Sequence, residues 1–168
     1  TGTFCGVQSY SGVLTFGVIN DHSSANVFRN MHKGIRSELG VLNLYNNHFT
    51  DIYEPLPSGG NVNTSLFTGA AIYSNGPGVD NIQQNTFKNC RIGIGLYGTG
   101  AIIQNNTMEN MDECIFSYRL GVGSLNIQDN ESLETNGSRN SITILEAHPS
   151  TSVMIDNNYI HKTINVQG

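Results

Sequence analysis

Short runs of alternating apolar and polar residues recur along the chain, and three such runs fit into each repeat. The first run of successive repeats is Val41–Leu44, Val79–Ile82, Ala101–Ile103, Leu125–Ile127 and Val153–Ile155. The third run is Gly34–Ile35, Ala71–Ile72, Ile92–Leu96, Cys114–Ile115 and Ile142–Ile144. A shorter second run, centred on residues such as Phe49 and Phe87, lies between them. Alternation with a period of two predicts β-strands with one buried face.

An asparagine motif precedes the second run of each repeat. An apolar residue follows the asparagine two positions later in every copy except one, where Ser132 stands instead. The spacings between successive asparagines are 21, 38, 21, 24 and 28 residues. The base period is therefore about 21 residues, and the longer spacings indicate insertions into a fixed repeat. The aligned residues are Asn26, Asn47, Asn85, Asn106, Asn130 and Asn158.

Three strands in about 21 residues predict a coil that returns to its starting point and stacks on itself. We therefore expect an all-β fold, a right-handed parallel β-helix of about six coils, with residues 1–168 as one domain. The run Gly6–Val7 looks like the third strand of a preceding coil, and the run Lys162–Ile164 looks like the third strand of the last coil. The sequence predicts no amphipathic helix to cap either end, so we expect this domain to be a segment of a longer protein.

The recurring asparagine has two physical explanations. Asparagine tolerates the left-handed backbone conformation that a sharp corner between sheets requires. An inward-facing asparagine could also hydrogen-bond its copies in neighbouring coils, which would satisfy a buried amide. The alternative is that these asparagines are ordinary solvated turn residues. Recurrence at the repeat period favours the ladder of stacked amides.

This repeat resembles that of the pectate-lyase-like family of right-handed parallel β-helices, over about residues 6–164. The resemblance implies an architecture but no particular activity, because the family includes lyases, glycosidases, epimerases, phage tail proteins and inert surface repeats. In the enzymes of the family, the substrate cleft lies along the sheet of third strands.

Two insertions separate second from third strands. One lies between Ile52 and Thr68, and the other spans about Glu134–Arg139. Both are expected to overhang the same edge of the third-strand sheet, where loops that bind ligands tend to lie. The alternative is tolerated surface length without a role.

The outer side of the third-strand sheet is the predicted binding face. If Ile35, Ile72, Ile94, Ile115 and Ile144 point inward, their neighbours point outward. One outward column would then be small: Gly6, Gly34, Ala71, Gly93, Cys114 and Thr143. Beside it would run four aromatic side chains on which sugar rings could stack: Tyr73, Tyr97, Phe116 and Tyr118. The alternative is that these aromatics only stabilise the sheet through cross-strand pairs.

Composition excludes several classes of partner. The net charge of −5 disfavours nucleic acids and anionic membranes. No run of 18 apolar residues is present, so we expect no insertion into a membrane. The cysteines Cys5, Cys90 and Cys114 lack zinc-binding spacing, and no pair of histidines has the spacing of metal ligands. We therefore predict neither a metal nor a cofactor.

The sequence contains few of the residue combinations that polysaccharide-cleaving enzymes need. Glycoside hydrolysis needs two carboxyl groups roughly 5 to 9.5 Å apart. Elimination from a uronate needs a base and a group that neutralises the substrate carboxylate, often calcium held by several acids. The predicted face offers Arg36 and Glu38 in one coil, which are candidates for a catalytic role, and Asp112, Glu113 and Arg119 near the strand ends of another. Neither set forms either constellation.

Three functions remain open. The first is a non-catalytic structural or adhesive segment of a secreted or cell-surface protein, with a polysaccharide or surface glycan bound on the third-strand face. The second is a fragment of a polysaccharide lyase or glycoside hydrolase. The third is a phage-type receptor-binding rod, which would require trimerisation.

Overall fold

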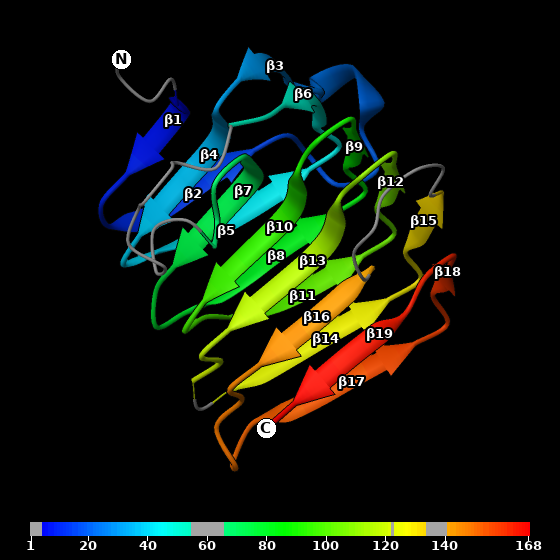
Figure 1. Cartoon of the computed structure of the whole chain (residues 1–168). Helices are drawn as coiled ribbons and strands as arrows, with labels where there is room; N and C mark the ends of the chain where they lie inside the picture. Colours follow the sequence, from blue (N-terminus) through cyan, green and yellow to red (C-terminus); the bar gives the residue numbers. More distant parts are fainter. Residues whose placement is uncertain (1–4, 55–65, 122, 134–140) are drawn as a thin grey trace.

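The computed structural model describes residues 5–54, 66–121, 123–133 and 141–168. Three parallel β-sheets wrap around one interior, and the chain visits them in rotation (Figure 1). The third-strand sheet contains β1 (Cys5–Ser9), β4 (Lys33–Glu38), β7 (Ala70–Asn75), β10 (Ile92–Tyr97), β13 (Glu113–Tyr118), β16 (Ile142–Leu145) and β19 (Ile164–Gln167). The first-strand sheet contains β2 (Gly12–Phe16), β5 (Gly40–Tyr45), β8 (Val79–Gln83), β11 (Gly100–Gln104), β14 (Ser124–Gln128) and β17 (Ser152–Asp156). The second-strand sheet contains β3 (Val27–Met31), β6 (His48–Ile52), β9 (Thr86–Lys88), β12 (Thr107–Glu109), β15 (Glu131–Leu133) and β18 (Tyr159–Ile160).

The predicted fold class is confirmed: the chain forms a parallel β-solenoid of about six coils. Every named strand pair is parallel, and each strand pairs with its equivalent in the next coil. The described helical structure consists of one short 3-10 turn, His22–Ser24. The last third strand begins at Ile164, two residues later than the run predicted from the sequence. No helix among the described residues has the length and apolar character needed to cross a membrane.

The interior consists of columns of stacked side chains. On the second-strand sheet, Phe28, Phe49 and Phe87 lie one above another, with ring centroids 4.8 and 5.1 Å apart and planes within 8°. Strand pairing continues this column through Met108, Ser132 and Ile160. Each side chain in such a column is enclosed by the coils above and below, so Phe49 and Phe87 are fully buried.

The predicted asparagine ladder is confirmed. Asn85 donates from both its backbone N and its Nδ2 to Asn106 Oδ1, at 2.9 and 3.1 Å. Asn106 donates in the same way to Asn130 Oδ1, at 3.0 and 2.9 Å. The same arrangement links Asn26 to Asn47, Asn47 to Asn85 and Asn130 to Asn158. Each of these asparagines therefore donates to the asparagine of the following coil, and the buried amides satisfy one another.

The two explanations for the asparagine apply to two neighbouring residues. Left-handed backbone conformations occur at the residue before the ladder asparagine, for example at Asn105, with φ of 54°. The equivalent residues are Asn46, Gln84, Asp129 and Asn157. A corner residue makes the turn, and the next residue fills it with an inward amide. Residues with positive φ also recur near the ends of the second strands and directly after the third strands. Arg119 and Glu146 belong to the group after the third strands.

The register predicted for β16 against β13 is wrong by two residues. Ile115 pairs with Ile142 rather than with Ile144, so Phe116 pairs with Thr143 and Tyr118 with Leu145. Ile142 and Ile144 both face the interior, and a slip of two residues keeps every side chain on the same face. The hydrophobic pattern could not distinguish these registers.

The predicted outward column of small residues is also wrong. Ala71 and Cys114 belong to the interior cluster, together with the adjacent Ile72 and Ile115. The backbone N–H groups of Cys114 and Ile115 both donate to the Ser141 carbonyl. Two successive residues of one strand thus oppose one residue of its partner, as in a β-bulge, and strict alternation fails at this point.

One carboxyl group lies inside the solenoid. Asp80 is fully buried in the first-strand sheet, and its Oδ1 accepts a hydrogen bond from the backbone N of Leu42 at 2.8 Å. Burial raises the pKa of Asp80 to about 6, although the nearby Ser74 hydroxyl and the Leu42 N–H partly offset this effect. Its Oδ2 makes no hydrogen bond of normal geometry with the described residues.

Asp80 is therefore expected to contribute more to stability at acidic than at neutral pH. The raised pKa means that the folded state binds the Asp80 proton more tightly than the unfolded state, so stability falls as pH rises from about 4 to about 6. The loss is expected to be about 3 kcal/mol. Urea unfolding at pH 4 and pH 7 measures it for the wild type and for Asp80→Asn, which cannot ionise. An equal pH dependence in the two proteins would contradict this assignment.

Candidate functional site

The candidate site is the outer side of the third-strand sheet. Strand pairing places Arg36 beside Tyr73, and Tyr97 beside Tyr118. The aromatic side chains on this side form a second hydrophobic cluster, separate from the interior core. We call this surface the aromatic face: Phe67, Tyr73, Tyr97, Phe116 and Tyr118.

Phe67 occupies the centre of the aromatic face. Its ring centroid lies 5.0 Å from that of Tyr73 and 5.2 Å from that of Phe116. Gly95 makes room for the ring, because a Cβ atom at this glycine would lie 2.6 Å from Phe67 Cδ1. Phe67 and Phe116 are 3 % and 6 % exposed, so Phe116, a predicted stacking residue, is almost fully buried beside Phe67.

Tyr73 is half-buried at the base of the aromatic face. The Arg36 guanidinium carbon lies 5.8 Å from the centroid of its ring, and Phe67 packs on the same ring. Burial, followed by the charge of Glu38, raises the pKa of Tyr73 to about 12. The Tyr73 hydroxyl therefore stays protonated at physiological pH and can donate a hydrogen bond.

Tyr97 and Tyr118 are partly exposed members of the aromatic face. Their ring centroids lie 5.9 Å apart, and the planes are tilted by 53°. Arg119 donates from Nη1 to the Tyr97 hydroxyl at 3.2 Å, and its guanidinium carbon lies 5.2 Å from the Tyr118 centroid. The two tyrosines are thereby connected across adjacent coils by one cation.

Glu146 completes this network from the next coil. It accepts hydrogen bonds from Arg119 Nε at 3.0 Å and from the Tyr118 hydroxyl at 2.9 Å. These two bonds lower the pKa of Glu146, and the bond to Glu146 raises the pKa of Tyr118. The bonds to Tyr97 and Glu146 raise the pKa of Arg119. Tyr118, Arg119 and Glu146 therefore keep their ordinary protonation states at neutral pH.

The predicted catalytic candidates Arg36 and Glu38 lie together at the other end of the aromatic face. Arg36 donates from Nε and Nη2 to Glu38 Oε1, at 2.9 and 2.7 Å. Glu38 Oε2 accepts a hydrogen bond from Asn75 Nδ2 at 2.8 Å. Both carboxylate oxygens thus accept hydrogen bonds from charged and amide donors, which suits a polar binding group better than a general acid.

The described part of the chain offers few other candidate sites for a metal ion or a ligand. Within it, no three histidine, cysteine, aspartate or glutamate side chains gather closely enough to hold a metal ion. The predicted insertion between Ile52 and Thr68 is described only at its two ends, and the whole insertion at Glu134–Arg139 lies outside the described residues. A surface pocket of about 180 Å³ lies at the corner between the second and third strands, and it is lined by Tyr53, Asn89, Cys90, Arg91, Asn110 and Asp112.

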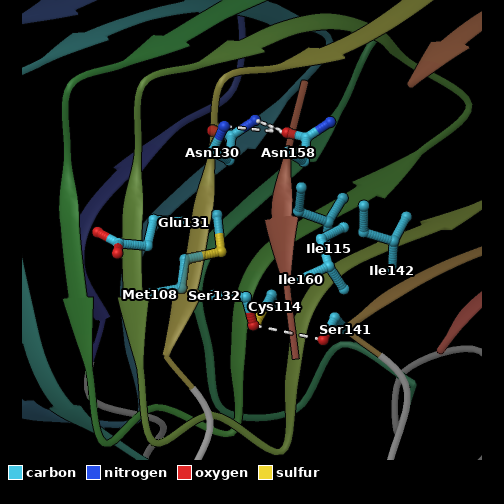
Figure 2. Close-up of a pocket in the computed structure, with 10 residues that line it drawn as sticks. All are labelled: Met108, Cys114, Ile115, Asn130, Glu131, Ser132, Ser141, Ile142, Asn158 and Ile160. Carbon is cyan, nitrogen blue, oxygen red and sulfur yellow. Dashed lines mark hydrogen bonds between the residues drawn. The ribbon is translucent and has the colours of Figure 1, made fainter. Parts of the chain in front are cut away.

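A small cavity lies inside the solenoid at Ser132, where the column continues beyond the phenylalanines. Ser132 replaces the expected apolar side chain, and its hydroxyl lies 3.3 Å from that of Ser141 and 3.2 Å from Cys114 Sγ. Figure 2 shows these side chains grouped below the Asn130–Asn158 rung of the ladder. The cavity measures about 10 Å³, which is room for one water molecule and too little for a substrate.

The sequence identified the tyrosines of this site but missed Phe67 and the pairing of Arg119 with Glu146. Phe67 lies at the end of an insertion without strand periodicity. The prediction aligned Thr143 with Cys114, whereas the structure pairs Thr143 with Phe116, so Glu146 was not brought next to Arg119.

Comparison with known proteins gives no family assignment. No protein-family model matches the chain, and neither a curated protein nor a solved structure is significantly similar to it.

Proposed function

We propose that this chain is a non-catalytic structural or adhesive β-solenoid segment of a secreted or cell-surface protein, and that its aromatic face binds glycans. The observation that carries the proposal is the strip formed by Tyr97 and Tyr118, flanked by hydrogen-bonding groups at both ends. Sugars present apolar ring faces that stack on aromatic rings and hydroxyl groups that need polar partners. Both kinds of partner occur together on this face.

The rigidity of the site supports a binding role. Tyr97 and Tyr118 stand on adjacent strands of one sheet, and Arg119 and Glu146 hold their hydroxyl groups. Side chains that are already ordered lose little conformational entropy when a ligand binds. A glycan chain lying along the solenoid axis would contact several coils.

The stacking tyrosines provide the test. Replacing both Tyr97 and Tyr118 with alanine is expected to weaken glycan binding at least tenfold, since each ring contributes about 1 kcal/mol. Tyr159→Ala is the matched control, because this tyrosine is 60 % exposed on the second-strand sheet. Binding to a glycan array measures the effect. Equal binding by the double variant and the wild type would contradict a role for this face.

Turnover and oligomeric state separate the alternatives. Incubation with bound glycans is expected to release neither new reducing ends nor unsaturated products. Turnover that Arg36→Ala or Glu38→Ala abolishes would instead favour a fragment of a polysaccharide lyase or glycoside hydrolase. A trimer in light scattering would favour the phage-type receptor-binding rod.

We also propose that the chain belongs with the pectate-lyase-like β-helices. Support comes from three parallel sheets, a buried asparagine ladder between the first and second strands, and insertions between the second and third strands. A comparison of the full parent sequence with that superfamily would test the assignment.

A further inference from the structure

We infer that the aromatic face selects neutral glycans and rejects glycans built from uronic acids. This inference rests on the proposed function, because it names the class of glycan that the same face would bind. It follows from how the cations of the third-strand sheet are paired.

Both guanidinium groups on the aromatic face are neutralised by carboxylates of the chain. Arg36 makes two hydrogen bonds to Glu38 Oε1, at 2.7 and 2.9 Å. Arg119 donates to Glu146 Oε2 at 3.0 Å. Each pair is formed by residues close in space on the same outer surface, so neither end of the face carries a net charge.

The remaining cation of the third-strand sheet is paired as well. In the described strands of this sheet, and in the corner residue directly after each of them, the cations are Lys33, Arg36 and Arg119. Lys33 Nζ lies 2.9 Å from Glu54 Oε2. A uronate carboxylate on this face would therefore have to displace a carboxylate of the protein from its cation.

Long-range electrostatics act in the same direction. The chain carries a net charge of −5, which repels polyanions. A uronate placed on Tyr97 and Tyr118 would lie beside the carboxylate of Glu146, which is bonded to the Tyr118 hydroxyl. Like charges at such short range oppose binding.

The same groups suit hydroxyl groups. A sugar hydroxyl both donates and accepts, so it can donate to a carboxylate and accept from an amide or guanidinium N–H. Glu38 and Asn75 offer both kinds of partner at one end, and Glu146 and Arg119 offer both at the other. Neutral sugars can use these groups without breaking either ion pair.

An array of neutral glycans, each presented beside its C6-oxidised uronate form, tests the inference. Wild-type protein is expected to bind a neutral form about tenfold more tightly than its matched uronate. Equal or tighter binding of the uronate form would overturn the inference while leaving glycan binding in place. Binding to no member of the array would instead refute the proposed function, and the inference with it.

Removing the carboxylate partner of one cation tests whether ion pairing sets the selectivity. Glu146→Gln leaves Arg119 without its carboxylate but keeps an oxygen for the hydrogen bonds, so uronate binding is expected to rise severalfold and to weaken with added salt. Glu109→Gln is the matched control, because it unpairs Lys88 in a similarly exposed ion pair on the second-strand sheet. If uronate binding were unchanged in Glu146→Gln, or rose equally in Glu109→Gln, the pairing would not set the selectivity.

Discussion

Replacing Asn106 with alanine is expected to lower the free energy of unfolding by roughly 3 to 5 kcal/mol, because buried polar groups of two other coils lose their partners. Asn106 Oδ1 accepts from both the backbone N and the Nδ2 of Asn85. Its own Nδ2 donates to Asn130 Oδ1 and to the Ile82 carbonyl at 2.8 Å. Alanine removes all of these bonds and offers no substitute, and the ladder position is 1 % exposed, so water cannot easily replace them.

Urea unfolding followed by circular dichroism measures this loss. Asn81→Ala is a matched control, because Asn81 donates to Asn43 on the partly exposed outer side of the first-strand sheet, at 2.8 Å. The control is expected to cost less than about 1 kcal/mol. Asn106→Asp adds a second test, since it keeps the acceptor for Asn85 but directs an oxygen at Asn130 Oδ1. This variant should be more stable than Asn106→Ala only when the aspartate is protonated. Equal losses in Asn106→Ala and Asn81→Ala would show that the ladder has no special role in stability.

The ladder also explains why the fold could be predicted from the sequence. A buried asparagine must be satisfied, and a parallel solenoid offers each one an identical partner in the next coil. The motif therefore recurs once in each coil, even where insertions lengthen the spacing between copies. The sequence did not show that the turn itself belongs to the preceding residue, such as Gln84 or Asn105, because both positions are rich in asparagine.

The candidate site could be predicted less completely, for two physical reasons. The alternating pattern fixes which side of a sheet a residue faces, but not which residue of the neighbouring strand it pairs with. Because isoleucine stands at both positions 142 and 144, a register shift of two residues leaves the buried pattern of this strand the same. This slip concealed the contact between Arg119 and Glu146. Phe67 follows an insertion, where no periodic pattern indicates the direction of the chain. Its packing over Gly95 depends on a tertiary contact with no local signal.

Replacing Phe87 with alanine is expected to lower the free energy of unfolding by about 3 to 5 kcal/mol, because the change opens a cavity in the middle of the interior column. Phe87 is fully buried, with its ring parallel to that of Phe49 on one side and Met108 opposite it in the next coil. The coils on either side are held by strand pairing, whose usual spacing is about 4.8 Å, so they cannot collapse far into the space. Stacked coils contact only their neighbours, and the lost contacts therefore weaken the junction between two particular coils.

Hydrogen exchange locates this weakening, and urea unfolding measures its size. Amides of β9 and of the adjacent β6 and β12 are expected to lose protection more than those of β17, at the end of the solenoid. Phe87→Leu should recover part of the stability, since it refills much of the volume. Tyr159→Ala, on the exposed outer side of the same sheet, should change stability by less than about 0.5 kcal/mol. A uniform loss of protection along the whole chain would instead mean that the six coils unfold as one cooperative unit, and the column would then stabilise the solenoid globally rather than junction by junction.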